Sequence, residues 1–223
     1  MNGPKALVFD AYGTLFDVHS VTRLAEGLFP GRGAALSQAW RTKQLEYTWQ
    51  RSLMGRYDDF NAVTADALDW ALESLRLPAD AAARTSLMRA YRELALFPEV
   101  RGALERLAAG HTLAILSNGH PDMLDAVVDH NDLRVHFGER VISVHEAGVF
   151  KPDPRVYALA TAHLGLPAAA IGFVSSNGWD AAGGKTFGFA VYWVNRGQAP
   201  VERLGVQPDR VVPDLAALAT LLA

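Results

Sequence analysis

Polar side chains follow several short apolar runs of the sequence, at the points where the runs end. Asp10, for example, ends the run Leu7-Val8-Phe9 and opens a turn. A carboxylate held rigidly at such a point, within reach of solvent, is suited to act as a nucleophile. Because ligands of open α/β sheets bind beyond the carboxyl ends of the strands, these positions are the first candidates for a site. The polar residues delivered in this way are Asp10, Thr14, Ser117, Asn118, Lys151, Ser175, Ser176, Asn177 and Asp180.

The apolar runs indicate buried parallel strands, and the segments between them have helical spacing. Strands are expected over residues 6–9, 113–116, 141–144, 171–174 and 190–194. Helices are expected over residues 99–109, 121–131, 154–164 and 180–187, with Asp180 beginning the last of them. Pro121 and Pro154 suit first helical turns, and Asp153 and Asp214 suit helix caps. The alternation predicts an α/β fold with a doubly wound, Rossmann-like and mainly parallel sheet.

Residues 18–97 interrupt this alternation. They are rich in Leu, Ala, Trp, Arg and Glu and contain no convincing strand, so we expect an all-helical insertion. Trp40, Tyr47 and Met54 recur every seven residues, which predicts one helix with a broad apolar surface. For most of these residues, packing in a small helical bundle is the alternative to a role in a site. The predicted domains are a catalytic core of residues 1–17 and 98–223 and a helical cap of residues 18–97.

Composition excludes several classes of partner. The formal net charge of −3 comes from 21 basic and 24 acidic residues, without a Lys/Arg block, so nucleic acid is not expected as a partner. The chain has no cysteine, which excludes disulfides, zinc–thiolate sites and thiol nucleophiles. No apolar stretch approaches the roughly 18 residues of a membrane span, and the first residues lack the apolar segment of a secretory signal. We therefore expect a soluble cytoplasmic protein with no membrane partner.

Five stretches of the chain resemble the haloacid dehalogenase superfamily and, within it, the L-2-haloacid dehalogenases. They are residues 9–17 (FDAYGTLFD), 41–55 (RTKQLEYTWQRSLMG), 116–119 (LSNG), 150–157 (FKPDP followed by Tyr157) and 173–180 (FVSSNGWD). The superfamily motifs alone imply the fold. The tyrosine at position 12, the stretch from Arg41 to Gly55 and the segment SSNGWD carry the resemblance to the subfamily.

The resemblance implies hydrolytic dehalogenation of L-2-haloalkanoic acids to D-2-hydroxy acids and halide, by a hydrolase that acts on carbon–halide bonds. Asp10 would attack C2 from the face opposite the halogen, invert that centre and form an aspartyl ester, which water then hydrolyses. Asp180 would orient or deprotonate the water, and its alternative or additional role is to cap the following helix.

The same resemblance implies the groups that support Asp10. Lys151 would pair with its carboxylate and steady the charge that develops during hydrolysis. Thr14 and Ser175 would hydrogen-bond to the same carboxylate, although each is elsewhere an ordinary turn hydroxyl. Asn177 completes the expected catalytic group.

For the substrate, the resemblance implies an anion-binding end and an apolar wall. Arg41 would reach over the site and receive the halide, since a delocalised guanidinium suits a large anion. Asn118 would donate an amide hydrogen to the halide, and Ser117 with nearby backbone N–H groups would hold the substrate carboxylate. Tyr157 would hydrogen-bond near the site, with a tyrosine facing the sheet as the alternative. The expected apolar wall consists of Tyr12, Leu45, Phe60 and Trp179, with core packing as the alternative for each.

Phosphatases of this superfamily pair the first aspartate with a second acid two residues later and hold Mg²⁺ through acidic groups after the fourth strand. Here Tyr12 and the pair Ser175-Ser176 occupy those places, so we expect no metal and no other cofactor. Asp17 or Asp153 as a substitute ligand is the weaker alternative.

Three other functions stay open at this point. They are hydrolytic ring-opening of a strained cyclic amino acid such as azetidine-2-carboxylate, a Mg²⁺-dependent phosphatase, and a non-catalytic anion-binding protein on the same fold. The expected partners are a small 2-haloacid and halide. The resemblance also implies a homodimer, for which Trp40, Trp49 and Trp70 of the insertion would supply aromatic surface.

Overall fold

A single parallel sheet organises the chain. The computed structural model describes residues 3–223, in which β1 (Ala6–Phe9), β2 (Thr112–Ser117), β3 (Val141–Ser143), β4 (Ile171–Ser175), β5 (Ala190–Val194) and β6 (Arg210–Val212) pair in the order β3-β2-β1-β4-β5-β6. Every neighbouring pair is parallel, with Val8 opposite Ala114 on one side and Phe173 on the other. The strand order reverses between β1 and β4, so the predicted doubly wound α/β fold is confirmed.

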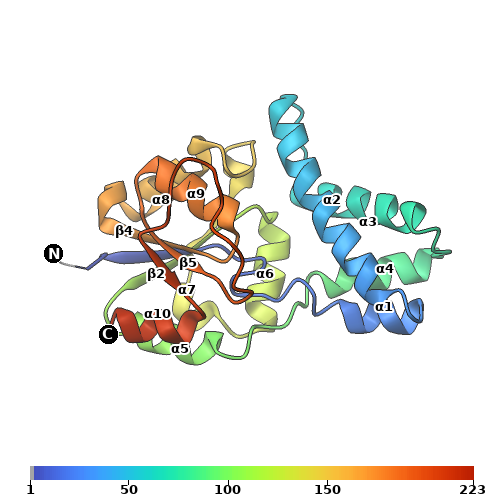
Figure 1. Ribbon diagram of the computed structural model, residues 1–223, viewed down its shortest axis with the longest axis horizontal. Coiled ribbons are helices and arrows are strands. Elements are labelled where there is room, and N and C mark those ends of the chain that lie inside the picture. Colours follow the sequence, from blue (N-terminus) through green and yellow to red (C-terminus); the bar gives the residue numbers. More distant parts are fainter. Residues whose placement is uncertain (1–2) are drawn as a thin grey trace.

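The central strand β1 is wholly apolar because both faces of the sheet are covered by helices. The core helices are α5 (Val100–Ala108), α6 (Pro121–His130), α7 (Arg134–Phe137), α8 (Pro154–Leu164), α9 (Gly178–Phe187) and α10 (Leu215–Leu221), with 3-10 turns at Val144–Glu146 and Ala168–Ala170. In Figure 1, α5 and α10 lie together on one side of the strands, and α8 and α9 lie on the other.

The predicted helix starts are correct at two positions and wrong at a third. Pro121 and Pro154 begin α6 and α8, and Asp153 caps the backbone of α8 as expected. The last helix before β5, however, begins at Gly178 with Asn177 as its N-cap residue. Asp180 is therefore the third residue of α9, not its first or its cap. Its side chain is consequently free to point into the protein.

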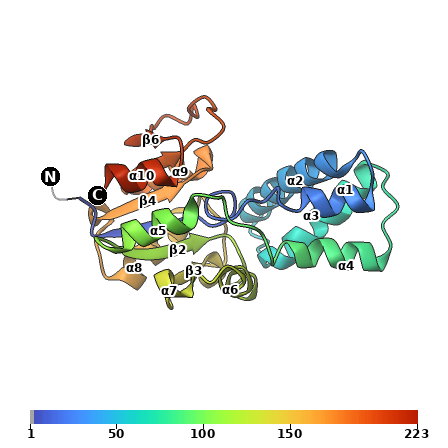
Figure 2. The ribbon, with the colours of Figure 1, turned by 90° about the horizontal axis from the view of Figure 1, so that it is seen from below.

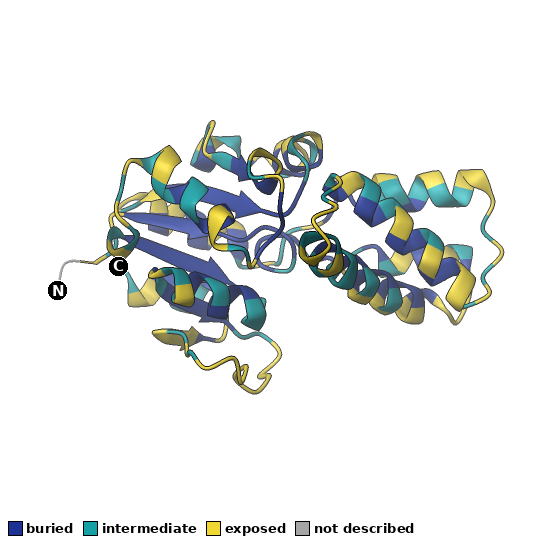
Figure 3. Ribbon diagram, turned by 90° about the horizontal axis from the view of Figure 1, so that it is seen from above, coloured by how far each residue is buried: buried dark blue, intermediate teal, exposed yellow. Residues whose placement is uncertain are grey.

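Residues 18–97, all of them described, contain helices and no strand. The helices are α1 (Thr22–Leu28), α2 (Gly33–Leu53), α3 (Phe60–Ser74) and α4 (Ala81–Ala90), and they lie beyond the carboxyl ends of the strands (Figures 1 and 2). Outer faces of these helices are exposed while their inner faces are buried, as Figure 3 shows, in the pattern of a small bundle. This arrangement supports our proposed division into a core of residues 1–17 and 98–223 and a helical cap of residues 18–97.

Two of the tryptophans expected on an open surface lie inside. Trp40 is 1% exposed, and its indole N–H donates to the Thr64 carbonyl of α3 at 2.8 Å. Trp49 is half-buried against Trp179 of the core, with ring centroids 5.4 Å apart. Only Trp70 of the three is exposed, at 40%. Among residues 3–223, no helix is long and apolar enough to cross a bilayer.

Candidate active site

The carboxyl ends of β1, β2 and β4 point toward the helical insertion (Figure 1). Polar side chains from distant parts of the sequence follow these strands and meet there. Asp10 follows β1 directly, and its backbone N–H donates to the Val174 carbonyl of β4 at 2.9 Å. This bond continues the sheet by one residue past the strand. The position of the Asp10 backbone is therefore as fixed as that of the central strand itself.

Asp10 is 5% exposed, and its carboxylate accepts three hydrogen bonds from side chains. Lys151 Nζ lies 3.0 Å from Oδ1, while Thr14 Oγ1 and Asn177 Nδ2 lie 3.1 and 2.8 Å from Oδ2. The Asn177 amide also donates to the Tyr12 carbonyl at 3.2 Å. Three donors from three segments of the chain thus fix the direction of this carboxylate.

Lys151 links two carboxylates. Its buried ammonium lies 3.0 Å from Asp10 Oδ1 and 3.0 Å from Asp180 Oδ2, and 5.1 Å from the centre of the Phe173 ring. Burial alone would lower the pKa of this ammonium, but the charges of Asp10 and Asp180 outweigh that effect and raise the pKa above its ordinary value. Lys151 is accordingly a fixed positive charge, with its backbone N–H held by Asn118 Oδ1 at 3.0 Å.

Asp180 is fully buried and accepts hydrogen bonds at both oxygens. Tyr157 Oη donates to Oδ1 at 2.8 Å, while Ser175 Oγ and Lys151 Nζ donate to Oδ2, each at 3.0 Å. Burial raises the pKa of this carboxyl from 3.8 to about 6; Lys151 opposes that rise, and the charge of Asp10 adds to it. A carboxyl group with a pKa near neutrality is suited to acid–base chemistry.

One expected contact is wrong in this arrangement. Ser175 does not reach Asp10; its hydroxyl donates to Asp180, because Ser175 ends β4 where the chain turns into α9. Tyr157 makes a hydrogen bond within the site, as expected: it is fully buried, its ring packs on Phe173 with ring centroids 5.6 Å apart, and its hydroxyl donates to Asp180 Oδ1 at 2.8 Å. Both residues support the second carboxylate of the site.

The expected anion-binding residues approach from the insertion and from the loop after β2. Arg41 on α2 is buried, and its guanidinium donates to the Tyr12 carbonyl at 3.2 Å and to Gln44 Oε1 at 2.8 Å. Asn118 uses its oxygen on Lys151, which leaves its amide hydrogens for another acceptor. Ser117 is fully buried, and its hydroxyl accepts the Gly119 N–H at 3.1 Å.

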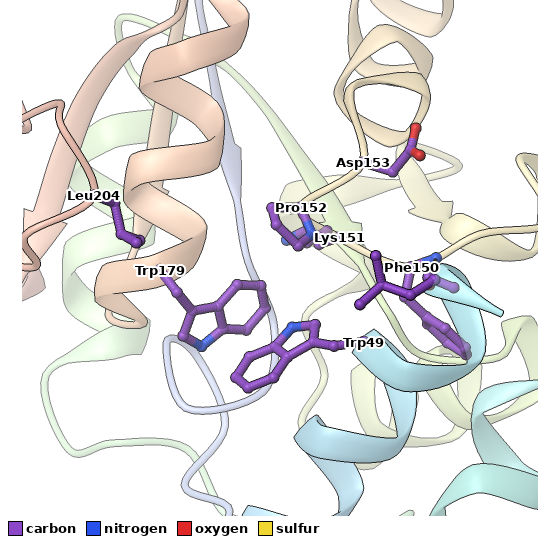
Figure 4. A pocket seen from close by; sticks show the side chains of 9 residues that line it. Trp49, Phe150, Lys151, Pro152, Asp153, Trp179 and Leu204 are labelled. Atoms are coloured by element: carbon purple, nitrogen blue, oxygen red, sulfur yellow. Dashed lines mark hydrogen bonds between the residues drawn. The ribbon is translucent and has the colours of Figure 1, made fainter.

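The expected apolar wall falls into two groups. Tyr12 and Phe60 pack together with ring centroids 5.4 Å apart, and both are buried. Trp179 instead borders a pocket of about 420 Å³ between the insertion and the core, where its ring meets that of Trp49 edge-on (Figure 4). Leu45 is half-buried on α2 and belongs neither to the Tyr12–Phe60 pair nor to the lining of this pocket. The pocket is lined by Trp49, Ser52, Leu53, Phe150, Lys151, Pro152, Asp153, Trp179 and Leu204.

The donor set does not fit a magnesium ion. Asp10 and Asp180 already share the Lys151 ammonium, which balances part of the negative charge that would attract a cation. Asp17 and Asp153 are engaged in a turn and a helix cap, accepting the backbone N–H groups of His19 and Arg155. Over residues 3–223, no cluster of three or more His, Asp or Glu side chains could hold a metal ion.

Sequence reasoning missed three polar residues around the site, namely Gln44, Arg196 and Glu99. Gln44 Oε1 accepts hydrogen bonds from the Arg41 guanidinium at 2.8 Å and from the Tyr91 hydroxyl at 3.2 Å. Arg196 holds the loops after β1 and β4 and is paired with Glu99. Arg196 lies two residues beyond the apolar run that became β5, so the rule that singled out Asp10 would also have found it.

Comparison with known proteins identifies the family of the chain. The sequence model of a family described as haloacid dehalogenase-like hydrolase matches residues 4–188. An (S)-2-haloacid dehalogenase from Pseudomonas sp. (strain YL) is 50% identical over 218 residues, which cover 97% of this chain and 94% of that protein.

Two solved structures have the same fold over nearly their whole length. The L-2-haloacid dehalogenase RSc1362 superposes with a TM-score of 0.96 at 46% identity, covering 99% of both chains. The L-2-haloacid dehalogenase from Xanthobacter autotrophicus with chloropropionic acid covalently bound superposes with a TM-score of 0.92 at 44% identity, covering 98% of both chains. The chain therefore belongs to the haloacid dehalogenase-like hydrolases.

Proposed function

We propose that this protein is an (S)-2-haloacid dehalogenase, which hydrolyses L-2-haloalkanoic acids to D-2-hydroxy acids and halide. The observation that carries the proposal is the Asp10 carboxylate, held by Lys151, Thr14 and Asn177, with no cluster of three or more metal-ligating side chains among residues 3–223. A relative of the same fold has chloropropionic acid covalently bound, and a carboxylate nucleophile accounts for such a bond.

In the first step, an Asp10 oxygen attacks C2 of the substrate from the side opposite the halogen. A carbon–oxygen bond forms, the carbon–halogen bond breaks, and its electron pair leaves with the halide, so the configuration at C2 inverts. Arg41 and the free amide hydrogens of Asn118 are the donors proposed for the halide. Because these groups are fixed before the reaction, little reorganisation is needed as the negative charge moves.

In the second step, water attacks the carbonyl carbon of the Asp10 ester. Asp180 takes a proton from that water, and the Lys151 ammonium stabilises the negative oxygen of the intermediate. The bond between the Asp10 carbonyl carbon and the substrate oxygen then breaks, and the proton held by Asp180 passes to that oxygen. The D-2-hydroxy acid leaves, and loss of the remaining carboxyl proton to solvent restores the Asp10 carboxylate. Ser175 and Tyr157 act on this step by holding Asp180 in place.

The direct test is halide release from L- and D-2-chloropropionate supplied separately, in excess EDTA. We expect chloride from the L enantiomer alone, D-lactate as product, and no chloride from Asp10→Asn. Azetidine-2-carboxylate and a phosphate monoester, assayed in parallel, cover ring-opening and phosphatase activity. Absence of chloride from both enantiomers would overturn the proposal.

Isotope labelling separates the ester mechanism from direct attack by water. With enzyme in excess and oxygen-labelled water, a single turnover should place the label in Asp10, because the product oxygen comes from the carboxylate. Mass spectrometry of the peptide that contains Asp10 measures this. Label found only in the hydroxy acid would argue for direct attack.

We also propose that the protein forms a homodimer through the insertion. The support is exposed apolar surface at the end of α2, where Leu53 is 88% and Met54 is 62% exposed, and at Trp70 on α3. Sedimentation equilibrium should give twice the mass of the chain, and a monomer at all concentrations would contradict the proposal. The cytoplasmic location stays a prediction from the sequence.

A further inference from the structure

Arg196 has the densest set of polar contacts of any side chain that the proposed mechanism does not use. It lies two residues after β5, and its side chain is 20% exposed. Its guanidinium makes five hydrogen bonds, as many as it has N–H groups. It also lies flat against Phe97, with the guanidinium carbon 3.9 Å from the ring centre. The guanidinium therefore contacts other parts of the protein both through its N–H groups and through the Phe97 ring.

The acceptors of Arg196 belong to three separate segments. It donates to the carbonyls of Gly13 and Thr14 after β1, at 3.4 and 3.0 Å, and to Ser176 Oγ after β4 at 2.8 Å. Glu99 Oε1 accepts two further bonds, at 2.9 and 2.6 Å, where the chain returns from the insertion to the core. One side chain thus ties both active-site loops to the second connection between insertion and core.

A short chain of hydrogen bonds leads from the residues that Arg196 contacts to the proposed nucleophile, Asp10. The backbone N–H of Ser176 donates to Thr14 Oγ1 at 2.8 Å, and Thr14 Oγ1 donates to Asp10 Oδ2 at 3.1 Å. Arg196 donates to the Thr14 carbonyl and to the Ser176 hydroxyl, and so contacts the first two residues of that chain. The distance between the loops, and with it the direction of the Thr14 hydroxyl, therefore depends on the arginine.

We propose that Arg196, held by Glu99, is a positioning residue that aims the Asp10 carboxylate for attack on carbon. This inference rests on the proposed dehalogenase function. Arg196 acts through Thr14 and does not touch the substrate, and its charge is balanced by Glu99. Its loss is therefore expected to slow formation of the ester without weakening substrate binding.

A lysine cannot replace this arginine in full. The planar guanidinium presents its donors in a fixed fork that reaches the carbonyl, the hydroxyl and the carboxylate at the same time. An ammonium keeps the charge but spans fewer of these acceptors. The order of activity is therefore expected to be wild type, then Arg196→Lys, then Arg196→Gln.

The test compares Arg196→Gln and Arg196→Lys with Arg134→Gln as a matched control. Arg134 likewise binds two carboxylates and a backbone carbonyl, namely those of Asp125, Asp129 and Gly138, but it lies on α7, away from the loops after β1 and β4. Rapid mixing with L-2-chloropropionate followed by mass spectrometry measures the rate of ester formation on Asp10. Substrate dependence of that rate gives the binding constant, and thermal unfolding of each variant measures stability.

We expect Arg196→Gln to slow ester formation about 10- to 100-fold, with the substrate binding constant within about twofold of wild type. Arg196→Lys should recover part of the rate, and Arg134→Gln should change stability alone. A folded Arg196→Gln that forms the ester as fast as Arg134→Gln would overturn the inference while the proposed function stands. If Arg196→Gln does not fold, Arg196→Lys takes its place in the same comparison. A wild-type protein that forms no ester from either enantiomer overturns both.

Discussion

At the scale of single residues, the site depends on how two carboxylates share one ammonium. Lys151 lies 3.0 Å from each of Asp10 and Asp180, so neither acid is buried without a partner. The two acids nevertheless differ in their surroundings, because Asp180 is wholly buried and Asp10 keeps a small exposed surface. That difference suits Asp10 to attack and Asp180 to handle protons.

The Tyr157 hydroxyl favours the charged form of Asp180, and its removal should raise the pKa of that carboxyl further. In wild type the pKa is raised to about 6. Tyr157→Phe removes one donor to the carboxylate, so we expect a further upward shift of about one unit. NMR titration of the aspartate carboxyl carbons, assigned with Asp180→Asn, measures this. Tyr47→Phe on α2 is the control, and an unchanged or lower pKa in Tyr157→Phe would contradict the prediction.

Replacing Lys151 should destabilise the protein in a pH-dependent way. Lys151→Met removes the cation that lowers the pKa of the buried Asp180, so the pKa of that carboxyl rises further above its value in the unfolded chain. An acid with a raised pKa in the folded state binds its proton more tightly there, so stability is lost as pH rises through that pKa. We expect urea unfolding to give a loss of about 3–5 kcal/mol at pH 8 and a smaller loss at pH 5.

The control for Lys151→Met is a more exposed pair. Lys185 binds Asp209 at 2.7 Å, and the two side chains are 34% and 39% exposed. Lys185→Met should cost only about 0–1 kcal/mol and show little pH dependence. Equal losses for the two variants at both pH values would argue against the buried triad as the cause.

The sequence was sufficient to find which polar residues reach the carboxyl edge of the sheet, because that depends only on where each apolar run ends. Asp10, Lys151 and Asp180 do meet there. The sequence could not tell which of two neighbouring carboxylates a hydroxyl faces. Ser175 was expected on Asp10 and donates to Asp180, since the choice depends on side-chain direction at the end of β4.

At the scale of elements, α9 positions Asp180 and depends on glycine to do so. A methyl group added at Gly183 would overlap the Tyr157 hydroxyl and lie 2.8 Å from Pro152 Cβ. The tyrosine ring is packed against Phe173 and Phe187 and has no room to retreat. The glycine therefore allows α8 and α9 to approach closely enough for Tyr157 to reach Asp180.

Gly183→Ala should consequently disrupt the contact and destabilise the protein by about 1–3 kcal/mol through overpacking. The control is Gly102→Ala on α5, where an added methyl group meets nothing within 4 Å. That substitution should stabilise the protein by about 0.5–1 kcal/mol, because alanine favours a helix. Urea unfolding measures both, and a stable Gly183→Ala would contradict the close packing.

Element boundaries could be predicted where apolar runs are continuous. β1, β5 and α8 have the predicted limits. β6 was missed because it is three residues long and Val211 is half exposed, so it carries no buried apolar run. The start of α9 was misplaced because Asn177 and Asp180 are both common cap residues, and the sequence alone does not choose between them.

At the scale of the whole molecule, the insertion and the core meet across the pocket bordered by Trp49 and Trp179 (Figure 4). Each ring comes from a different part of the chain, so the pocket exists only when the two parts are together. Phe150 strengthens the junction, because its backbone N–H donates to Ser52 Oγ at 3.2 Å. The contacts that bury Trp40 and half-bury Trp49 could not be predicted, since helical periodicity does not say which apolar face meets which neighbour.

Trp49→Ala should weaken substrate binding more than it slows chemistry. Loss of the apolar contact is expected to raise KM about fivefold, equivalent to ~1 kcal/mol, with kcat within about twofold of wild type. The control is Trp70→Ala, an exposed tryptophan on α3 beneath the Lys43 ammonium. Steady-state kinetics with L-2-chloropropionate measures both variants, and a Trp49→Ala enzyme with unchanged KM would show that the pocket does not serve the substrate.

The ammonium shared by two acids has a consequence for the timing of the proposed reaction. The negative charge of Asp10 is one of the causes that raise the pKa of Asp180. Conversion of Asp10 to a neutral ester removes that charge and leaves Lys151 to Asp180 alone. The pKa of Asp180 then falls, so the base releases any proton it held and becomes ready at the moment when a water needs to be activated. Completion of the first step thereby leaves Asp180 in the charged form that the second step needs.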